Sequence, residues 1–184
     1  MATSTSTFYK EKFKGTWGQA AQKESFIKEQ IELYTDRIVI ESGFGAGSDE
    51  YIKGSSGSHG FEKSEPDFQI KDSDICIEVT GPLRPIRIGS TLLINPRKID
   101  YAFANPEKEY WMAWVNGVTT FRRDVRLVRI GELFKAGEAN GEIIREQFES
   151  RGFQQFFYSI PHDHKTVCSF DKFLIYLNET TSTP

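Results

Sequence analysis

The chain has 184 residues, of which 38% are hydrophobic, 14% aromatic and 27% charged. This length suits one domain with its own core, and the aromatic content excludes a disordered chain. The formal net charge of −3 argues against a protein that coats nucleic acid regardless of sequence. We therefore expect a single domain, residues 1–184, with a core over about 17–130 and a C-terminal extension over 131–178.

The expected compartment follows from the cysteines and the apolar runs. Cys76 and Cys168 both lie in apolar segments, so we expect buried, reduced thiols. Residues 1–7 lack the apolar segment of a signal peptide, and no apolar run approaches the roughly 20 residues of a membrane span. We expect a cytoplasmic protein without a membrane partner.

The first half of the chain predicts a helix, a strand and a long loop. Apolar residues recur at three- and four-residue steps over 17–34, which predicts a helix with Thr16 as its N-cap. Glu24 falls on the apolar stripe of that helix. A β-branched run at 37–41 predicts a strand, and the Gly- and Ser-rich segment 42–64 predicts a loop.

Two further strands, 66–71 and 74–80, should pair through a tight turn. Strand side chains alternate between faces, so Glu78 should share a face with Thr80. A carboxylate inside an apolar strand is seldom buried without a partner. Glu78 therefore indicates a functional group or, alternatively, a solvent-facing edge or a pair with an arginine such as Arg87.

The second half begins with a predicted helix over 95–104, capped by Asn95 with Pro96 at its first position. A continuous apolar run at 110–115 predicts a strand buried on both faces. The remaining predictions are a strand at 125–130, helices at 132–136 and 142–151, short strands at 156–160 and 166–169, and either a strand or a helix at 170–177.

This order of elements, over roughly 17–115, resembles the PD-(D/E)xK nuclease superfamily, which includes many restriction enzymes. The Pro-Asp pair ending at Asp67 matches the family's Asp, and Glu78 matches its second carboxylate. Glu24 sits where many members place an additional metal-facing Glu. The resemblance implies an α/β fold with a restriction-endonuclease-like core, a central mixed β-sheet flanked by helices.

The same resemblance implies a metal-dependent endonuclease that hydrolyses phosphodiester bonds in DNA. Asp67, Glu78 and Glu24 would bind Mg²⁺ or Mn²⁺, which prefer oxygen ligands. The family's catalytic lysine is replaced by Thr80, which can donate one hydrogen bond but brings no positive charge. Lys98 on the following helix is our first candidate for a migrated base.

Basic residues and the Gly/Ser loop predict where DNA would bind. The stretch 79–98 contains four bases and no acid, and a second basic run at 122–129 is interrupted only by one Asp. The sequence GSSGSHG within the loop is similar to the substrate-side loop of Holliday-junction resolvases. The candidate DNA-binding residues are Ser56, Ser58, Arg84, Arg87 and Arg97. Solvated strand edges are the alternative for the arginines.

Two other functions compete with the nuclease hypothesis. Thr80 favours a catalytically inactive nuclease-fold module that binds nucleic acid or a protein partner, and an unrelated α/β protein is the third alternative.

Lys71 is a weaker candidate than Lys98 for the catalytic base. The pair His162 and His164 indicates a turn more than a metal site. A homodimer would suit an enzyme that cuts two strands.

Overall fold

The computed structural model describes residues 5–42, 65–82, 84–118, 121–150 and 153–180. The helices are α1 (Thr5–Tyr34), α2 (Pro96–Ala104), α3 (Glu132–Ala139) and α4 (Phe170–Glu179), with a short 3-10 helix η2 (Arg122–Asp124). The strands are β1 (Val39–Glu41), β2 (Phe68–Ile70), β3 (Ile75–Thr80), β4 (Leu92–Ile94), β5 (Glu109–Val115), β6 (Val125–Arg129), β7 (Ile144–Ser150), β8 (Phe153–Ile160) and β9 (Val167–Ser169). No helix within these ranges is long and apolar enough to cross a bilayer.

A six-stranded mixed sheet in the order β1-β2-β3-β5-β6-β9 forms the centre of the molecule. β1, β2 and β3 make an antiparallel meander. The chain then passes through β4 and α2 before β5 pairs in parallel with β3. β6 and β9 extend the sheet with antiparallel pairs. The predicted α/β class, with a mixed central sheet and flanking helices, is confirmed.

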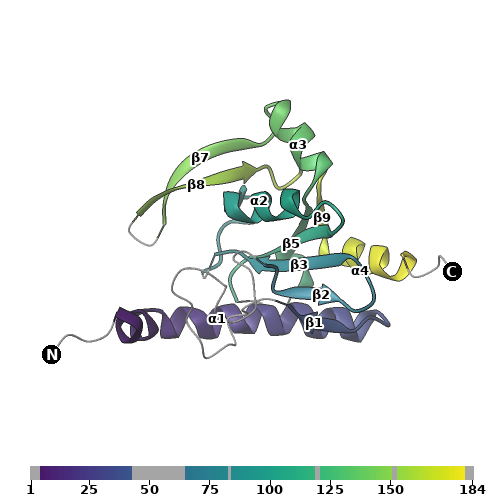
Figure 1. Cartoon of the computed structure of the whole chain (residues 1–184), viewed down its shortest axis with the longest axis horizontal. Coiled ribbons are helices and arrows are strands. Elements are labelled where there is room, and N and C mark those ends of the chain that lie inside the picture. Colours follow the sequence, from purple (N-terminus) through teal and green to yellow (C-terminus); the bar gives the residue numbers. More distant parts are fainter. Residues whose placement is uncertain (1–4, 43–64, 83, 119–120, 151–152, 181–184) are drawn as a thin grey trace.

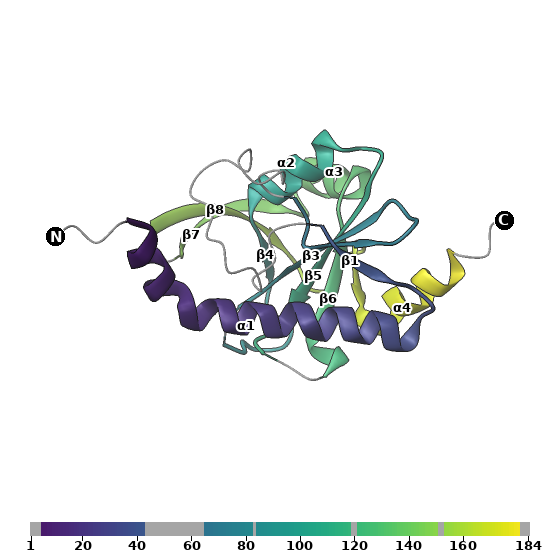
Figure 2. The same cartoon turned by 60° about the horizontal axis from the view of Figure 1, so that its bottom comes forward.

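Each face of this sheet has its own core. α1 and α4 cover one face (Figures 1 and 2), where Ile27 and Phe173 pack with Ile77. α2 covers the other face, where Ile99 packs with Met112. A second sheet, in the order β4-β8-β7, lies beyond α2 together with α3. Elements from both halves of the chain therefore enclose the α2 side of β3 and β5.

Several local predictions are confirmed because their chemistry is local. The Asn95 side chain accepts a hydrogen bond from the Arg97 backbone N–H at 3.0 Å, and Pro96 opens α2. β5 is buried on both faces from Tyr110 onward. Asp72 adopts a positive φ of 56° in the turn between β2 and β3, and α1 ends at the expected residue.

Other predictions were wrong. α1 begins at Thr5, so Thr16 lies inside the helix and is not its cap. Within the segment 142–151, predicted as a helix, residues 144–150 form strand β7, because pairing with β8 along the length of the strand outweighs the helix propensity. β4 was not foreseen, and the ambiguous segment 170–177 is helix α4, capped by Ser169. The predicted loop, including Ser56 and Ser58, lies almost wholly outside the described residues.

The two cysteines are free thiols. Cys76 is buried as expected, whereas Cys168 is only partly buried. Burial raises the pKa of the Cys168 thiol to about 11, which keeps it protonated and unreactive near neutral pH.

Candidate functional site

Asp67 and Glu78 lie opposite each other at the end of the β2–β3 pair. The register joins Phe68 to Ile77 and Gln69 to Cys76, so one further step places Asp67 opposite Glu78. Directly opposed residues point to the same face of a sheet. The two carboxyl groups therefore face the same side, the one covered by α2.

The Glu78 side chain is only 9% exposed and is paired with Lys98 from α2. The Lys98 Nζ lies 2.8 Å from Glu78 Oε1. Burial raises the pKa of the Glu78 carboxyl, and Lys98 partly counters that shift. Burial alone would lower the pKa of Lys98, but the carboxyl groups of Glu78 and Asp67 raise it above its ordinary value. The alternatives of a solvent-facing Glu78 or a Glu78–Arg87 pair were wrong.

Two buried oxygens beside this pair have no hydrogen-bond partner within the described residues. They are Glu78 Oε2 and the Tyr110 hydroxyl. Tyr110 lies on β5 beside Cys76, on the same face as Glu78. Burial and the nearby Glu78 and Asp67 carboxyl groups raise the pKa of Tyr110. An unpaired buried oxygen costs free energy, so this pair of oxygens is suited to a polar or cationic ligand.

Asp67 is held in place by the backbone of the next strand. The Val79 N–H donates to Asp67 Oδ2 at 2.7 Å. Burial, followed by the charges of Glu78 and Glu24, raises the pKa of Asp67 well above its usual range. Asp67 and Glu78 share the single ammonium of Lys98, and both favour the protonated form more than a free carboxyl group does. A cation between them would lower the pKa of each.

The fit to a divalent cation rests on oxygen donors alone. Asp67 and the unpartnered Glu78 Oε2 are hard ligands of the kind that Mg²⁺ and Mn²⁺ take. Glu24 lies near enough to raise the pKa of Asp67. In the described part of the chain, however, no three His, Cys, Asp or Glu side chains gather closely enough to hold a metal ion. Two carboxylates with waters and a substrate phosphate would complete a magnesium shell in the usual way.

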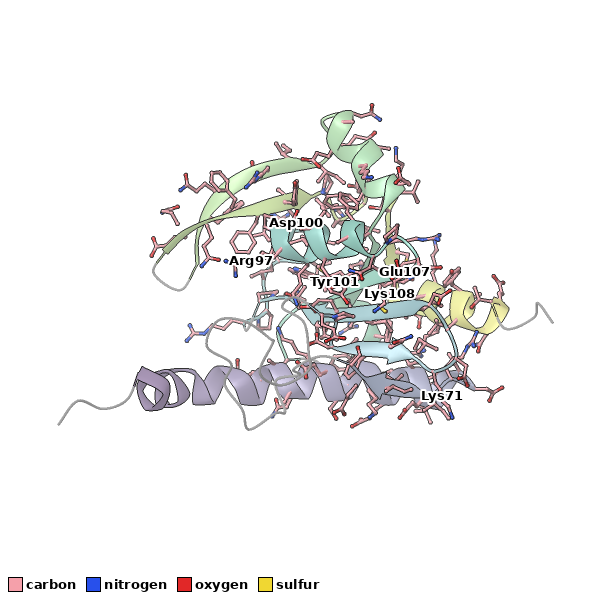
Figure 3. All side chains as sticks on the ribbon, viewed as in Figure 1. Lys71, Arg97, Asp100, Tyr101, Glu107 and Lys108 are labelled. Atoms are coloured by element: carbon pink, nitrogen blue, oxygen red, sulfur yellow. The ribbon has the colours of Figure 1, made fainter. Side chains whose placement is uncertain are left out.

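The two other positions considered for the catalytic cation lie differently. Thr80 is half-buried, two residues beyond Glu78 on the same face of β3. Lys71 lies in the turn at the opposite end of β2 from Asp67. Figure 3 shows Lys71 near the C-terminal end of α1, remote from Arg97 at the start of α2. Lys98 is therefore the lysine that the fold brings to the carboxyl groups.

Sequence reasoning missed Lys23, a buried lysine on α1. Its residue surface is 4% exposed, and its Nζ donates to the backbone carbonyls of Gly81 at 3.0 Å and Pro82 at 2.6 Å. Burial lowers the pKa of Lys23 to about 8. The amine ties α1 to the chain just after β3, and so fixes the end of the strand that carries Glu78 and Thr80. Its signal was a lysine on the apolar stripe, three residues after Ala20.

The remaining candidates fall into two groups. Arg84, Arg87 and Arg97 are all exposed, as a phosphate-binding role requires. His164 is buried and lies 3.0 Å from Glu142 Oε2 and 2.7 Å from the Thr166 hydroxyl. His164 thus joins the Gly137–Glu142 region to β9 as a structural residue.

Comparison of the chain with protein-family models, curated proteins and solved structures finds no match in any of the three. The functional argument therefore rests on the residues of this chain.

Proposed function

We propose that the protein is a Mg²⁺- or Mn²⁺-dependent endonuclease that hydrolyses phosphodiester bonds in DNA, built on a restriction-endonuclease-like core. The observation that carries the proposal is the contact of Lys98 Nζ with Glu78 at 2.8 Å, on the face that Asp67 shares. It supplies a cation where Thr80 brings none. The meander, the α2 crossover and parallel β5 are what the resemblance implies.

Each group has a role consistent with its position. Asp67 and Glu78 would hold the metal, which supplies an activated water and neutralises charge developing on the phosphate. Lys98 would stabilise the same charge from α2. Its raised pKa keeps the ammonium protonated throughout the neutral range.

One observation favours a second function, an inactive module that binds nucleic acid or a protein. Lys98 Nζ forms an ion pair with Glu78 Oε1, and the ammonium group can neutralise the carboxylate in place of a metal ion. The two functions differ in their metal response. Calorimetric titration should detect Mn²⁺ binding to a catalytically active site, and should detect none if Lys98 alone neutralises the carboxylates.

The direct test is incubation of supercoiled plasmid and single-stranded DNA with Mg²⁺, Mn²⁺ or EDTA. Asp67→Ala and Glu78→Gln should abolish metal-dependent cleavage, and Lys98→Met should slow it by about 10²–10³-fold, as for loss of one transition-state donor. The exposed ion pair of Glu132 and Lys135, at 3.2 Å, offers matched controls. Glu132→Gln and Lys135→Met should cleave normally. Full activity in Asp67→Ala or Glu78→Gln would contradict the proposal.

A further inference from the structure

Two basic stretches far apart in the sequence meet at one cleft. Its enclosed volume is about 20 Å³, which admits one oxygen of a phosphate, so the rest of the group would lie at the open mouth of the cleft. The basic residues that line it are Arg87, Arg123, Arg126 and His162. Arg87 comes from the segment between β3 and β4, whereas Arg123 and Arg126 come from η2 and β6. The buried Trp114 of β5 also lines it.

The arginines of the second basic run, at 122–129, fall into two groups according to whether a carboxylate pairs with them. Arg122 pairs with Asp171 at 3.0 Å, and Arg129 pairs with Glu109 at 3.4 Å. In the described ranges, by contrast, no ion pair joins a carboxylate to Arg123 or Arg126. The two arginines without such a partner are the two that face the cleft.

The cleft carries a net positive charge. Its lining residues include three arginines, Arg87, Arg123 and Arg126, and one acid, Asp124, so formal positive charges outnumber negative ones. Backbone contacts orient part of this charge in advance. Arg126 Nη1 donates to the carbonyls of Arg123 at 2.8 Å and Val125 at 2.9 Å. An oriented guanidinium loses less freedom when it binds an anion.

The Arg87 side of the cleft is also fixed by the fold. The Asn116 side chain accepts from the Ile86 N–H at 2.8 Å and donates to the Ile86 carbonyl at 2.9 Å. Gly89, at a φ of 90°, closes the turn so that a Cβ there would meet the His162 ring at 3.5 Å. This clamp anchors the chain next to Arg87 and holds the turn against His162.

The cleft lies on the same face of the sheet as Glu78. Thr80, Trp114 and Arg126 are successive cross-strand partners. From Glu78, Arg126 lies two strands across and two residues along. With about 4.8 Å between strands and about 3.3 Å per residue, the two Cα atoms are roughly 12 Å apart. At about 3.4 Å of axial rise per nucleotide, that span is roughly three nucleotide steps.

We propose that this cleft binds a backbone phosphate of the nucleic acid a few nucleotides from the bond held at Asp67 and Glu78. The proposal rests on the proposed function for the identity of the polyanion. Guanidinium groups suit phosphate because their planar N–H donors match its oxygens. The cleft would set the distance between the bound phosphate and the carboxyl groups, and so position the strand.

The test uses the full chain with a short fluorescein-labelled duplex DNA in EDTA, followed by anisotropy at increasing NaCl. The double variant Arg87→Gln/Arg123→Gln should bind about tenfold more weakly, and its slope of log K against log salt should fall by about 1 to 2. The matched control, Lys28→Gln/Lys172→Gln, removes two charges from α1 and α4 on the opposite face. The control should keep the wild-type slope.

Inorganic phosphate distinguishes a general phosphate site from a site that needs the polymer. At matched ionic strength, phosphate should compete with DNA for the wild type and not for the double variant. Three outcomes would each contradict the cleft proposal. The slope of log K against log salt could be unchanged in Arg87→Gln/Arg123→Gln, the lysine control could lose as much affinity as the arginine variant, or the wild type could fail to bind DNA. If binding depends on the arginines but no cleavage occurs, the cleft stands and the nuclease proposal falls. If the arginine variant cleaves DNA with an unaltered KM, the nuclease proposal stands and the cleft proposal falls.

Discussion

The substitution Lys98→Met isolates the contribution of the buried ion pair. Lys98 Nζ is the partner of Glu78 Oε1 at 2.8 Å, and Glu78 Oε2 has none within the described residues. The variant would leave a carboxylate that is 9% exposed without a counterion. Breaking a buried pair from one side typically costs about 3–5 kcal/mol, mostly because the remaining charge is unpaired.

The sign of the pH dependence follows from the direction of the pKa shift. Burial already raises the pKa of Glu78 in the folded protein, and loss of Lys98 should raise it further. A raised folded pKa means that the stability contribution is complete below the unfolded pKa and is lost as pH rises through the folded pKa. The stability difference between wild type and Lys98→Met should therefore be small near about pH 4 and largest near about pH 8.

Urea unfolding over that pH range measures the effect. Glu78→Gln/Lys98→Met removes both charges and should recover much of the stability that Lys98→Met loses, because no charge remains unpaired. Lys135→Met, from the exposed pair with Glu132, should cost less than about 1 kcal/mol at every pH. A loss in Lys98→Met that is independent of pH, or no larger than that of Lys135→Met, would refute the reasoning.

Three further predictions concern other residues near the site. The pKa of Lys23 is lowered to about 8, so the folded state releases this proton before the unfolded state does. Between about pH 7 and pH 9 the free energy of unfolding of the wild type should therefore rise by about 1 kcal/mol relative to that of Lys23→Met. Urea denaturation at the two pH values measures this change, and a difference that does not vary with pH would contradict it. Tyr110→Phe should raise the free energy of unfolding by about 1 kcal/mol, since it removes an unpartnered buried hydroxyl, and a large loss would mean that the hydroxyl has a partner. Gly81→Ala should cost about 3 kcal/mol or more, because φ is 127° and a Cβ would overlap the Val115 carbonyl; Gly131→Ala, with a φ of 119° and nothing within 4 Å, is the control that measures backbone strain alone by thermal unfolding.

The sequence allowed the candidate site to be predicted where the signal was periodic. Alternation along 74–80 put Glu78 on one face, and a tight turn between the strands implied that Asp67 would come near it. Lys98 was foreseen only as one of two lysines. The choice between Lys98 and Lys71 needed the parallel pairing of β3 with β5, which places α2 over the carboxyl groups.

Other parts of the site could not be predicted for physical reasons. The run that forms β5 is apolar on both faces, so its sequence does not reveal that Tyr110 lies on the same face of the sheet as Glu78. The cleft needed residues 87 and 126, which are far apart in the sequence, to line one site, and no local pattern encodes this. The helix predicted where β7 lies was wrong for the same reason, because the stability of the β7–β8 hairpin comes from strand pairing and not from local propensity.

The positions of the carboxyl groups and the arginines on one face imply that metal and nucleic acid bind cooperatively. Asp67 and Glu78 carry two negative charges against the one positive charge of Lys98, a net of −1 when both are ionised. A phosphate drawn to Arg126 brings its neighbours toward this negative charge, which repels them unless a second cation is present. Mn²⁺ should therefore bind more tightly when duplex DNA is present, and DNA more tightly by the same factor when Mn²⁺ is present, because the coupling is reciprocal. Titration of each ligand with and without the other, in the wild-type protein with a duplex of non-hydrolysable phosphodiester analogues, measures both factors. Equal affinities with and without the second ligand would show that the two sites are independent.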